Sequence, residues 1–585
     1  MKQETKICQN CKQNFTIEPE DFDFYEKIKV PPPTFCWQCR FERRCAYRNE
    51  RRLMRATSSK SGKPIFTLYP PDAGLTLYDA DEWYADDWDQ MATGREYDFS
   101  RPFFVQLSEL AHKAPLFARN VINNVNCDYC AYTGYSKNCY LIFQTVDCED
   151  SAYGNAVDYS RSCFDNSHLA KCERCYNSFW LTNCHRVHCS MQCTDCVDLW
   201  FSKNCRNCSD CFGCVNLTNQ KYCIFNQPYS KEEYKNKIME MNLDKYSSFQ
   251  VMAAAAEEFW LKFPNRYLQG MMNDDVTGEY IYNSKNIHYG YLVRGSRDLK
   301  YVQYMQLPGN VDCYDATMWG ENSELFYETV GSGDGHRIRF CMECHTKIRD
   351  LEYCINCVSC SNCFGCVGLR KKEYCIFNKQ YTPEEFRKLR ERIVQHMNDM
   401  PYADKMGRTY RYGEFFPLEL SYYGYDTDLM RDHFFPKKEH ALEQGYAWYE
   451  PDRREYETTF DAKNLPDSIK EVTDEILKEV IRCNSCAKAF RIIPIELAFL
   501  RREGIPAPRL CYECRHKRRI VWRNKTPLYS RKCHCNGMKS ENGVYQNTVS
   551  HQHGTGKCPN EFETSYAPDR KEIVYCEQCY QSEVV

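Results

Sequence analysis

Four cysteines near the beginning of the chain have the spacing of a metal site. Cys8 and Cys11 form one Cys-x2-Cys pair, and Cys36 with Cys39 forms a second. Two thiolates in one tight turn can bind a single ion, and a second such turn completes a tetrahedral site that suits zinc. The same spacing recurs near the other end of the chain, in Cys483, Cys486, Cys511 and Cys514. Because four protein ligands leave no open coordination position, we expect both sites to be structural.

The residues around both sites resemble a zinc-ribbon module of bacteria, of treble-clef-like type. The first copy contains Cys8, Cys11, Phe15, Phe24, Tyr25, Pro33, Cys36, Cys39 and Arg40. The second contains Cys483, Cys486, Phe490, Pro508, Cys511, Cys514 and Arg515. The whole chain is similar to a family of uncharacterised cysteine-rich proteins of small-genome bacteria that carry such modules at both ends. That resemblance supplies no activity. It implies a second ribbon after each first one, with a Cys-x2-Cys-Gly-Lys turn and a tyrosine eight residues beyond the second cysteine.

The second ribbon at the C-terminal end is interrupted by an insertion, residues 534–557. Cys533 fits the first ligand of the implied pattern, and Cys558 lies at the expected distance from Tyr566. We therefore predict a third zinc site, and about three zinc ions per chain, with the ligands Cys533, Cys558, Cys576 and Cys579. Cys535 in place of Cys558 is the alternative.

The second ribbon at the N-terminal end lacks these cysteines. Ser58 and Ser61 occupy the first ligand pair, and Asp79 and Glu82 occupy the places of Cys576 and Cys579. We expect this module to have lost its metal.

The insertion contains a second set of ligand types. His551 and His553 lie two residues apart, on one face if the segment is a strand, and Cys535 could join them in a three-ligand zinc site. An open fourth position could activate water, as in a hydrolase or deaminase. The alternative is a solvated loop without metal. We assign no catalytic residue.

Cysteines also recur at every third residue in two internal runs. Cys205 to Cys214 is one run and Cys354 to Cys366 is the other. A ferredoxin-type run needs a final gap of three residues and then proline, whereas Val215 follows Cys214. We favour free cysteines that pack in a narrow core, with iron–sulfur or additional zinc binding as the less favoured alternatives.

The chain contains a long internal duplication. The stretch from Cys205 to Glu233 returns as Cys357 to Glu385, and units of about 11 or 12 residues precede each copy. Short repeats of this kind predict a parallel β-helix, with two units for each full coil and period-two alternation in its strands. Capping boxes at Ser230 and Thr382 predict helices after each copy. The expected fold is mainly β with α inserts: two duplicated parallel β-solenoid domains flanked by small zinc-ribbon modules.

The domain boundaries follow from these patterns. We expect a zinc ribbon with a basic flank at 1–56 and a degenerate, acidic second ribbon at 57–100. The first solenoid covers 101–226, a helical insert 227–273 and the second solenoid 274–378. A helix and an aromatic-rich region cover 379–465. A zinc ribbon with a basic flank at 466–532 and the interrupted ribbon at 533–585 complete the chain.

Basic residues follow the second cysteine pair at each end. Guanidinium groups can pair with phosphates, and interleaved aromatics such as Trp522 can stack on unpaired bases. We predict contacts with RNA or DNA through Arg43, Arg44, Arg48, Arg51, Arg52, Lys517, Arg518, Arg519 and Arg523. The alternative is a solvated cationic surface, or one neutralised by the acidic segment 79–89.

The composition bounds the function. The 39 cysteines among 585 residues would indicate disulfides in a secreted protein, but the first ten residues have no apolar core of a signal peptide and no apolar run spans a membrane. We therefore expect a cytoplasmic protein without membrane partners, and thiolate metal ligands. The favoured function is a non-enzymatic zinc-binding scaffold or adaptor that contacts nucleic acid or a ribonucleoprotein. Two alternatives are a protein-interaction scaffold that uses the solenoid faces, and a zinc-dependent enzyme built on the insertion.

Overall fold

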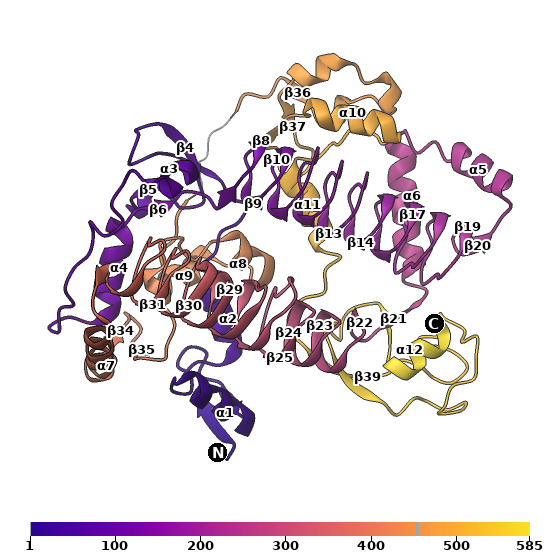
Figure 1. The fold of residues 1–585 in the computed structure, drawn as a ribbon. Coiled ribbons are helices and arrows are strands. Elements are labelled where there is room, and N and C mark those ends of the chain that lie inside the picture. The colour runs from indigo at the N-terminus through magenta and orange to yellow at the C-terminus, as the bar shows by residue number, and fades with distance from the viewer. Residues whose placement is uncertain (1, 451–455, 585) are drawn as a thin grey trace. The chain divides into compact units, whose positions relative to one another are not determined.

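The chain folds into two compact units, each of which combines segments that are distant in the sequence. The computed structural model describes residues 2–450 and 456–584 (Figure 1). The first unit contains Met1–Arg119 and Leu268–Pro451, and the second contains Asn120–Tyr267 and Asp452–Val585. Each unit has a parallel β-solenoid and at least one group of four cysteines, so the fold is mainly β with helices, as expected.

The solenoid of the second unit is a stack of very short coils. β9 (Ala131–Gly134), β11 (Phe143–Val146) and β12 (Asn155–Asp158) are neighbours in a parallel sheet. Phe143 pairs with Ala131, and corresponding groups of adjacent coils lie 12 residues apart. One unit of the sequence repeat therefore forms a whole coil, and the prediction of two units for each coil is wrong.

The remaining strands of this solenoid continue the same stack. They are β7 (Val121–Ile122), β8 (Val125–Asp128), β10 (Lys137–Tyr140), β13 (Ser167–Ala170), β14 (Phe179–Thr182), β15 (His185–His188), β16 (Met191–Thr194), β17 (Val197–Trp200), β18 (Ser209–Phe212), β19 (Lys221–Ile224) and β20 (Gln227–Pro228). One sheet has the order β16-β14-β13-β12-β11-β9-β7, and another has the order β15-β17-β18-β19-β20.

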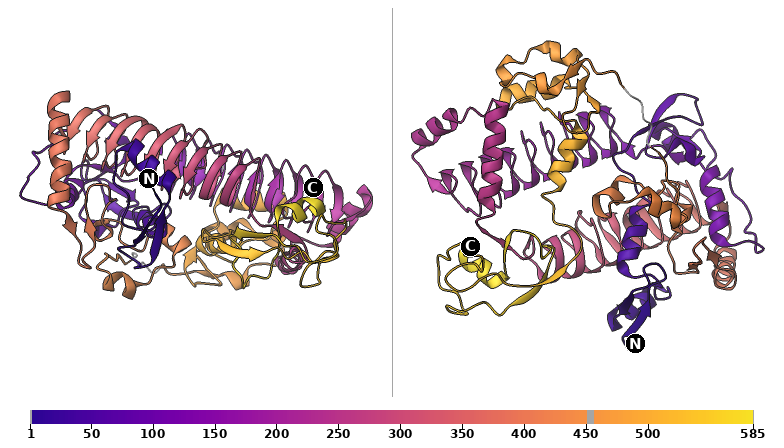
Figure 2. Two further views of the ribbon diagram at one scale, coloured as in Figure 1. Left: turned by 90° about the horizontal axis from the view of Figure 1, so that it is seen from below. Right: turned by 180° about the vertical axis from the view of Figure 1, so that it is seen from behind.

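The solenoid of the first unit has the same construction with several longer strands. Its strands are β22 (Gly270–Met271), β23 (Asp274–Tyr282), β24 (Lys285–Arg294), β25 (Arg297–Lys300), β26 (Val311–Tyr314), β27 (Thr317–Trp319), β28 (Ser323–Tyr327), β29 (Val330–Arg339), β30 (His345–Glu352), β31 (Ser361–Phe364), β32 (Glu373–Ile376) and β33 (Lys379–Gln380). Except for the antiparallel pair at β33, the paired strands are parallel. Figure 2 shows the coils as a row of stacked turns.

Backbone corners at every third residue make the coils narrow. Tyr129, Tyr132 and Tyr135 all have φ between 52° and 56°, in the left-handed region. The residue after most of these corners is buried, as in Cys130 and Ser136. Side chains therefore reach the core at every third position along the coil, while burial alternates with a period of two within single strands such as β9 and β11. A left-handed corner costs an L-residue about 1–2 kcal/mol, and stacking of coil on coil offsets this cost.

Asparagine and aspartate form ladders along some of these corners. Asn126 donates to Asn138 Oδ1 at 2.9 Å, and Asn138 donates to Asp150 Oδ1 at 2.9 Å. Asn and Asp tolerate the left-handed region better than other residues, because their side chains hydrogen-bond locally.

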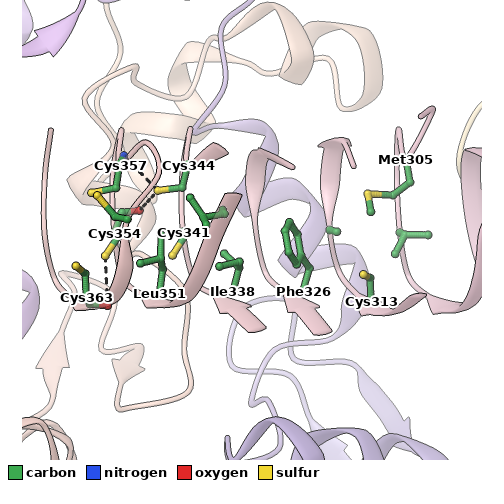
Figure 3. Packing of buried hydrophobic residues seen from close by; sticks show 14 of the residues in the cluster. Met305, Cys313, Phe326, Ile338, Cys341, Cys344, Leu351, Cys354, Cys357 and Cys363 are labelled. Carbon is green, nitrogen blue, oxygen red and sulfur yellow. Dashed lines mark hydrogen bonds between the residues drawn. The ribbon is translucent and has the colours of Figure 1, made fainter. Parts of the chain in front are cut away.

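Cysteine fills much of the core of both solenoids, together with aliphatic residues and, in the first unit, Phe326. Figure 3 shows Cys341, Cys344 and Cys354 stacked with Leu351 in the first unit. The Cys354 thiol lies 3.4 Å from the carbonyl oxygen of Glu352 and 3.5 Å from that of Cys363. The three-residue spacing of these cysteines is thus the spacing of the corners. Among the described residues, no group of metal-ligating atoms gathers in either solenoid.

Helices cover one end of each solenoid. α5 (Lys231–Glu240) and α7 (Pro383–Asp399) begin at Ser230 and Thr382, and both capping boxes form as predicted. The ring of Phe386 in α7 lies 5.9 Å from the ring of Tyr374 in β32. α6 (Tyr246–Trp260) follows α5 in the second unit. Residues 101–119, which the sequence interpretation placed in the first solenoid, instead contain α4 (Phe103–Lys113) and belong to the first unit. Within the described part of the chain, every helix is too short or too polar to cross a membrane.

Candidate metal centres

The first cysteine module brings its four predicted thiols together. β1 (Glu4–Ile7) and β2 (Asn14–Ile17) form a hairpin whose turn carries Cys8 and Cys11. α1 (Pro19–Ile28) follows, and α2 (Trp37–Cys45) carries the second pair, with Cys36 as its N-cap and Cys39 in its first turn. All four sulfur atoms lie within 4.8 Å of one another.

Backbone and helix geometry favour negative charge at this cluster. The Cys36 amide donates to Cys8 Sγ at 3.3 Å, and the Asn10 side chain donates to Cys39 Sγ at 3.4 Å. The N-terminus of α2 also favours thiolates through its unpaired amides and dipole. These are the features that a four-thiolate metal site requires.

The module at the other end repeats this geometry. β37 (Ile481–Arg482) and β38 (Ala489–Phe490) flank the first pair, α10 (Pro494–Glu503) follows, and α11 (Tyr512–Ile520) has Cys511 as its N-cap. The Cys511 amide donates to Cys483 Sγ at 3.2 Å. Desolvation opposes ionisation of this thiol, but the amides of Cys486 and Cys511 lower the pKa of Cys483 to about 7.

A third group of four cysteines lies in the last module. It is built from β39 (Tyr529–Lys532), β40 (Glu561–Thr564), β41 (Ile573–Tyr575) and α12 (Glu577–Val584). The group contains Cys533, Cys558, Cys576 and Cys579. Cys558 Sγ lies 3.8 Å from Cys576 Sγ and 3.7 Å from Cys579 Sγ. Of the two alternatives left open by the sequence, Cys558 therefore occupies the fourth position.

In the corresponding module near the N-terminus, hydrogen bonds connect the residues that occupy the positions of these cysteines. β3 (Met54–Thr57) and β4 (Pro64–Thr67) form its hairpin, and α3 (Ala80–Tyr84) has Asp79 as its N-cap in a capping box with Glu82. The Ser58 hydroxyl donates to the Glu82 carboxylate, and the Ser61 amide donates to Ser58 Oγ at 3.2 Å. Burial opposes the charge, but hydrogen bonds from the hydroxyls of Ser58 and Ser61 lower the pKa of Glu82. Among the described residues, no metal-ligating group lies here.

A fourth group lies in the insertion. Cys535, His551 and His553 come together as the sequence suggested, and Cys579 joins them. The sequence gave no signal for Cys579 in this group, because its spacing from Cys576 already assigned it to the neighbouring site.

Most of the basic residues predicted to contact nucleic acid have partners within their own unit. Arg43 lies 2.8 Å from Glu328, Arg44 lies 3.2 Å from Asp315, and both side chains are at most 2% exposed. Arg48 pairs with Glu343 at 2.7 Å. Arg51 and Arg52 pair with Asp432 and Asp426, and Arg519 pairs with Asp165. Arg523 is also buried, whereas Lys517 and Arg518 are exposed.

Arginines after the second cysteine pair attach the modules of Cys8–Cys39 and Cys483–Cys514 to the solenoids of their units. In the first unit, Arg40 and Arg44 of α2 share Asp315, which follows β26. In the second unit, Arg515 and Arg519 of α11 share Asp165. Aromatic contacts accompany both pairs: Phe24 stacks on Tyr314 at 3.9 Å, and Phe499 lies 4.5 Å from Phe164.

Comparison with known proteins provides no family for the chain: no family model matches it, and no curated protein matches it.

Proposed function

We propose that this protein is a non-enzymatic scaffold in which zinc-binding modules pack against two β-solenoids and stabilise them. The observation that carries the proposal is the burial of Arg40 and Arg44, and of Arg515 and Arg519, against the solenoids, directly after the second cysteine pair of each module. An ion bound by Cys36 and Cys39 fixes the start of α2, and therefore the position of the arginines one and two turns later. Buried ion pairs contribute orientation more than net stability.

Zinc fits the donor sets. Four thiolates in a compact group suit a tetrahedral, redox-inert cation, and such a group leaves no position for substrate or water. The amide contacts to Cys8 and Cys483 support thiolates rather than thiols. Each site therefore contributes folding energy rather than catalysis.

We also propose that the two units arose by duplication of one ancestral arrangement of solenoid and paired cysteine modules. The repeated sequence of the solenoids, the equal spacing of the four-cysteine groups and the equivalent roles of Asp315 and Asp165 support this origin.

A protein is the partner class that the surface favours over nucleic acid. Most predicted phosphate contacts are buried in ion pairs, and only Lys517 and Arg518 of α11 remain exposed among them. The solenoid of the second unit instead exposes aromatic side chains, including Tyr135 and Tyr159. If nucleic acid were the partner, Lys517→Glu with Arg518→Glu would abolish binding in a gel-shift assay, and affinity would fall steeply with salt.

The zinc content and stability of the full chain test the scaffold proposal. We expect stoichiometric zinc after purification without added metal, and cooperative loss of the folded signal on chelation. Cys36→Ser should release one ion, whereas Cys45→Ser is the matched control, because Cys45 is buried in the same helix but lies outside the group. A chain that holds no zinc, or that unfolds identically with and without chelator, would contradict the proposal.

A further inference from the structure

Two groups of ligand atoms in the last module share one cysteine. The first contains Cys533, Cys558, Cys576 and Cys579, and the second contains Cys535, His551, His553 and Cys579. Within each group all ligand atoms lie within 4.8 Å of one another. A single thiolate can bridge two ions, because its sulfur has more than one lone pair.

The hydrogen bonds of His553 direct one ring nitrogen toward the shared cysteine. Its Nδ1 lies 2.9 Å from the carbonyl oxygen of Gly556, and its Nε2 lies 3.4 Å from Cys579 Sγ. A carbonyl oxygen only accepts, so Nδ1 carries the proton. The lone pair of Nε2 is then free to bind a metal ion beside Cys579.

The other histidine is oriented by a carboxylate. His551 Nε2 lies 2.8 Å from Glu583 Oε1, and both side chains are almost completely buried. Its Nδ1 lies 3.2 Å from Cys535 Sγ. The proton on Nε2 is donated to Glu583, which leaves Nδ1 as the ligand. A carboxylate on the far side of a histidine is the usual support of a metal-bound imidazole.

Further side chains hold this arrangement in place. Thr548 donates its amide to Glu583 at 2.8 Å, and the Tyr545 hydroxyl donates to Glu583 at 3.0 Å. The Asn547 side chain donates to Cys535 Sγ at 3.2 Å. The insertion thus supplies two ligating histidines together with the groups that orient them, which a solvated loop would not require.

We propose that the last module binds two zinc-type divalent cations bridged by the thiolate of Cys579. One ion has four sulfur ligands, and the other has the two sulfurs of Cys535 and Cys579 with one nitrogen from each histidine. The inference rests on the proposed zinc binding by the four-cysteine modules. With Cys579 as fourth ligand the second site is closed, so it does not supply the open position on which the hydrolase alternative depended.

Cadmium-113 NMR of the full chain tests the bridge. We expect four bound ions per chain, of which two show cadmium–cadmium coupling through the shared sulfur. His553→Ala should remove one ion and the coupling, and leave three ions. His534→Ala is the matched control, because His534 lies in the same insertion but outside both groups.

The outcomes separate this inference from the proposed function. Three ions that are unaffected by His553→Ala would overturn the second site and leave the scaffold proposal standing. Four ions without coupling would overturn the bridge. Absence of cadmium from all four-cysteine groups would overturn the scaffold proposal itself.

A second variant addresses the positioning residue. Glu583→Gln should weaken the second ion by about 10–100-fold, measured by competition with a chelator, while the three four-cysteine sites keep their affinity. An unchanged affinity would contradict the assigned role of Glu583.

Discussion

The second cysteine module of one unit and its counterpart in the other solve the same structural problem with different chemistry. In both, a turn after a strand is joined to the start of a helix. In the second unit, Cys533 and Cys558 face Cys576 and Cys579, whereas in the first unit Ser58 contacts Glu82, which forms a capping box with Asp79. The helix N-terminus favours an anion at this position in either case. The same backbone arrangement therefore carries either a group of four cysteines that could hold a metal ion or a set of hydrogen bonds.

Removal of metal by a chelator should have the largest effect on stability, and it should destabilise only one of these two modules. Structural zinc contributes on the order of 10 kcal/mol to the folding of a small module. We expect amides of β39, β40 and α12 to lose protection from hydrogen exchange when the metal is removed, while those of β3, β4 and α3 keep it. Equal loss of protection in both modules would show that Ser58 and Glu82 do not replace a metal.

Converting one module into the other would sharpen the comparison. The fourfold change Ser58→Cys, Ser61→Cys, Asp79→Cys and Glu82→Cys should add one zinc ion per chain, measured by elemental analysis. Its module should then become sensitive to chelator. The change Ser59→Cys, which lies in the same turn but outside the four positions, serves as the control and should add none.

Breaking the buried ion pairs should affect both units to a similar extent. Asp165→Ala leaves Arg515 and Arg519 buried without this partner, and Asp315→Ala does the same to Arg40 and Arg44. Each change should lower the free energy of unfolding of its unit by about 3–5 kcal/mol, measured by denaturant titration. Glu391→Ala and Glu258→Ala remove exposed carboxylates and should change it by less than about 1 kcal/mol. A small loss of stability with Asp165→Ala and a large loss with Asp315→Ala would show that the two sets of arginine–aspartate ion pairs are not equivalent.

A smaller effect should be a loss of stability at acidic pH. Desolvation lowers the pKa of His188 to about 3 in the second unit and that of His345 to about 4 in the first. A buried histidine that stays neutral in the folded state makes its full contribution to stability above about pH 6.5, the pKa of histidine in the unfolded chain. This contribution is lost as the pH falls toward the pKa of the same histidine in the folded state. Each of the two histidines should therefore lower the free energy of unfolding of its unit by about 2 kcal/mol at pH 5. His188→Gln should remove that part of the pH dependence, measured as the difference from wild type in unfolding at pH 7 and pH 5; an unchanged difference would contradict the prediction.

The sequence predicted the metal groups better than the solenoid core. Cys8 to Cys39 and Cys483 to Cys514 could be identified because a tight turn places two thiols on one ion whatever surrounds it. Cys205 to Cys214 has the same local spacing for another reason, namely the left-handed corner before each inward residue. Such corners are occupied by tyrosine, leucine and lysine as well as by asparagine, so no turn signal marks them.

The burial of most of the basic residues could not be predicted from the sequence, for a physical reason. Arg44 and Arg519 look like a cationic surface because their partners, Asp315 and Asp165, lie far away in the sequence. Only the three-dimensional structure brings them together. The role of Cys579 was hidden in the same way, because one residue belongs to two groups and a spacing rule assigns it once.

The attachment of each module to a distant solenoid imposes an order on synthesis. Arg40 pairs with a residue 275 positions later, and Arg515 with one 350 positions earlier. At about 5–20 residues per second, the ribosome takes on the order of tens of seconds to make the partner of Arg40. During that time the complete N-terminal module contains arginines whose carboxylate partners have not yet been made. The solenoid of the second unit is made next, before the cysteine module that packs against it. We therefore expect the nascent chain to depend on chaperones or on early metal loading, and neither unit corresponds to one uninterrupted segment of the gene.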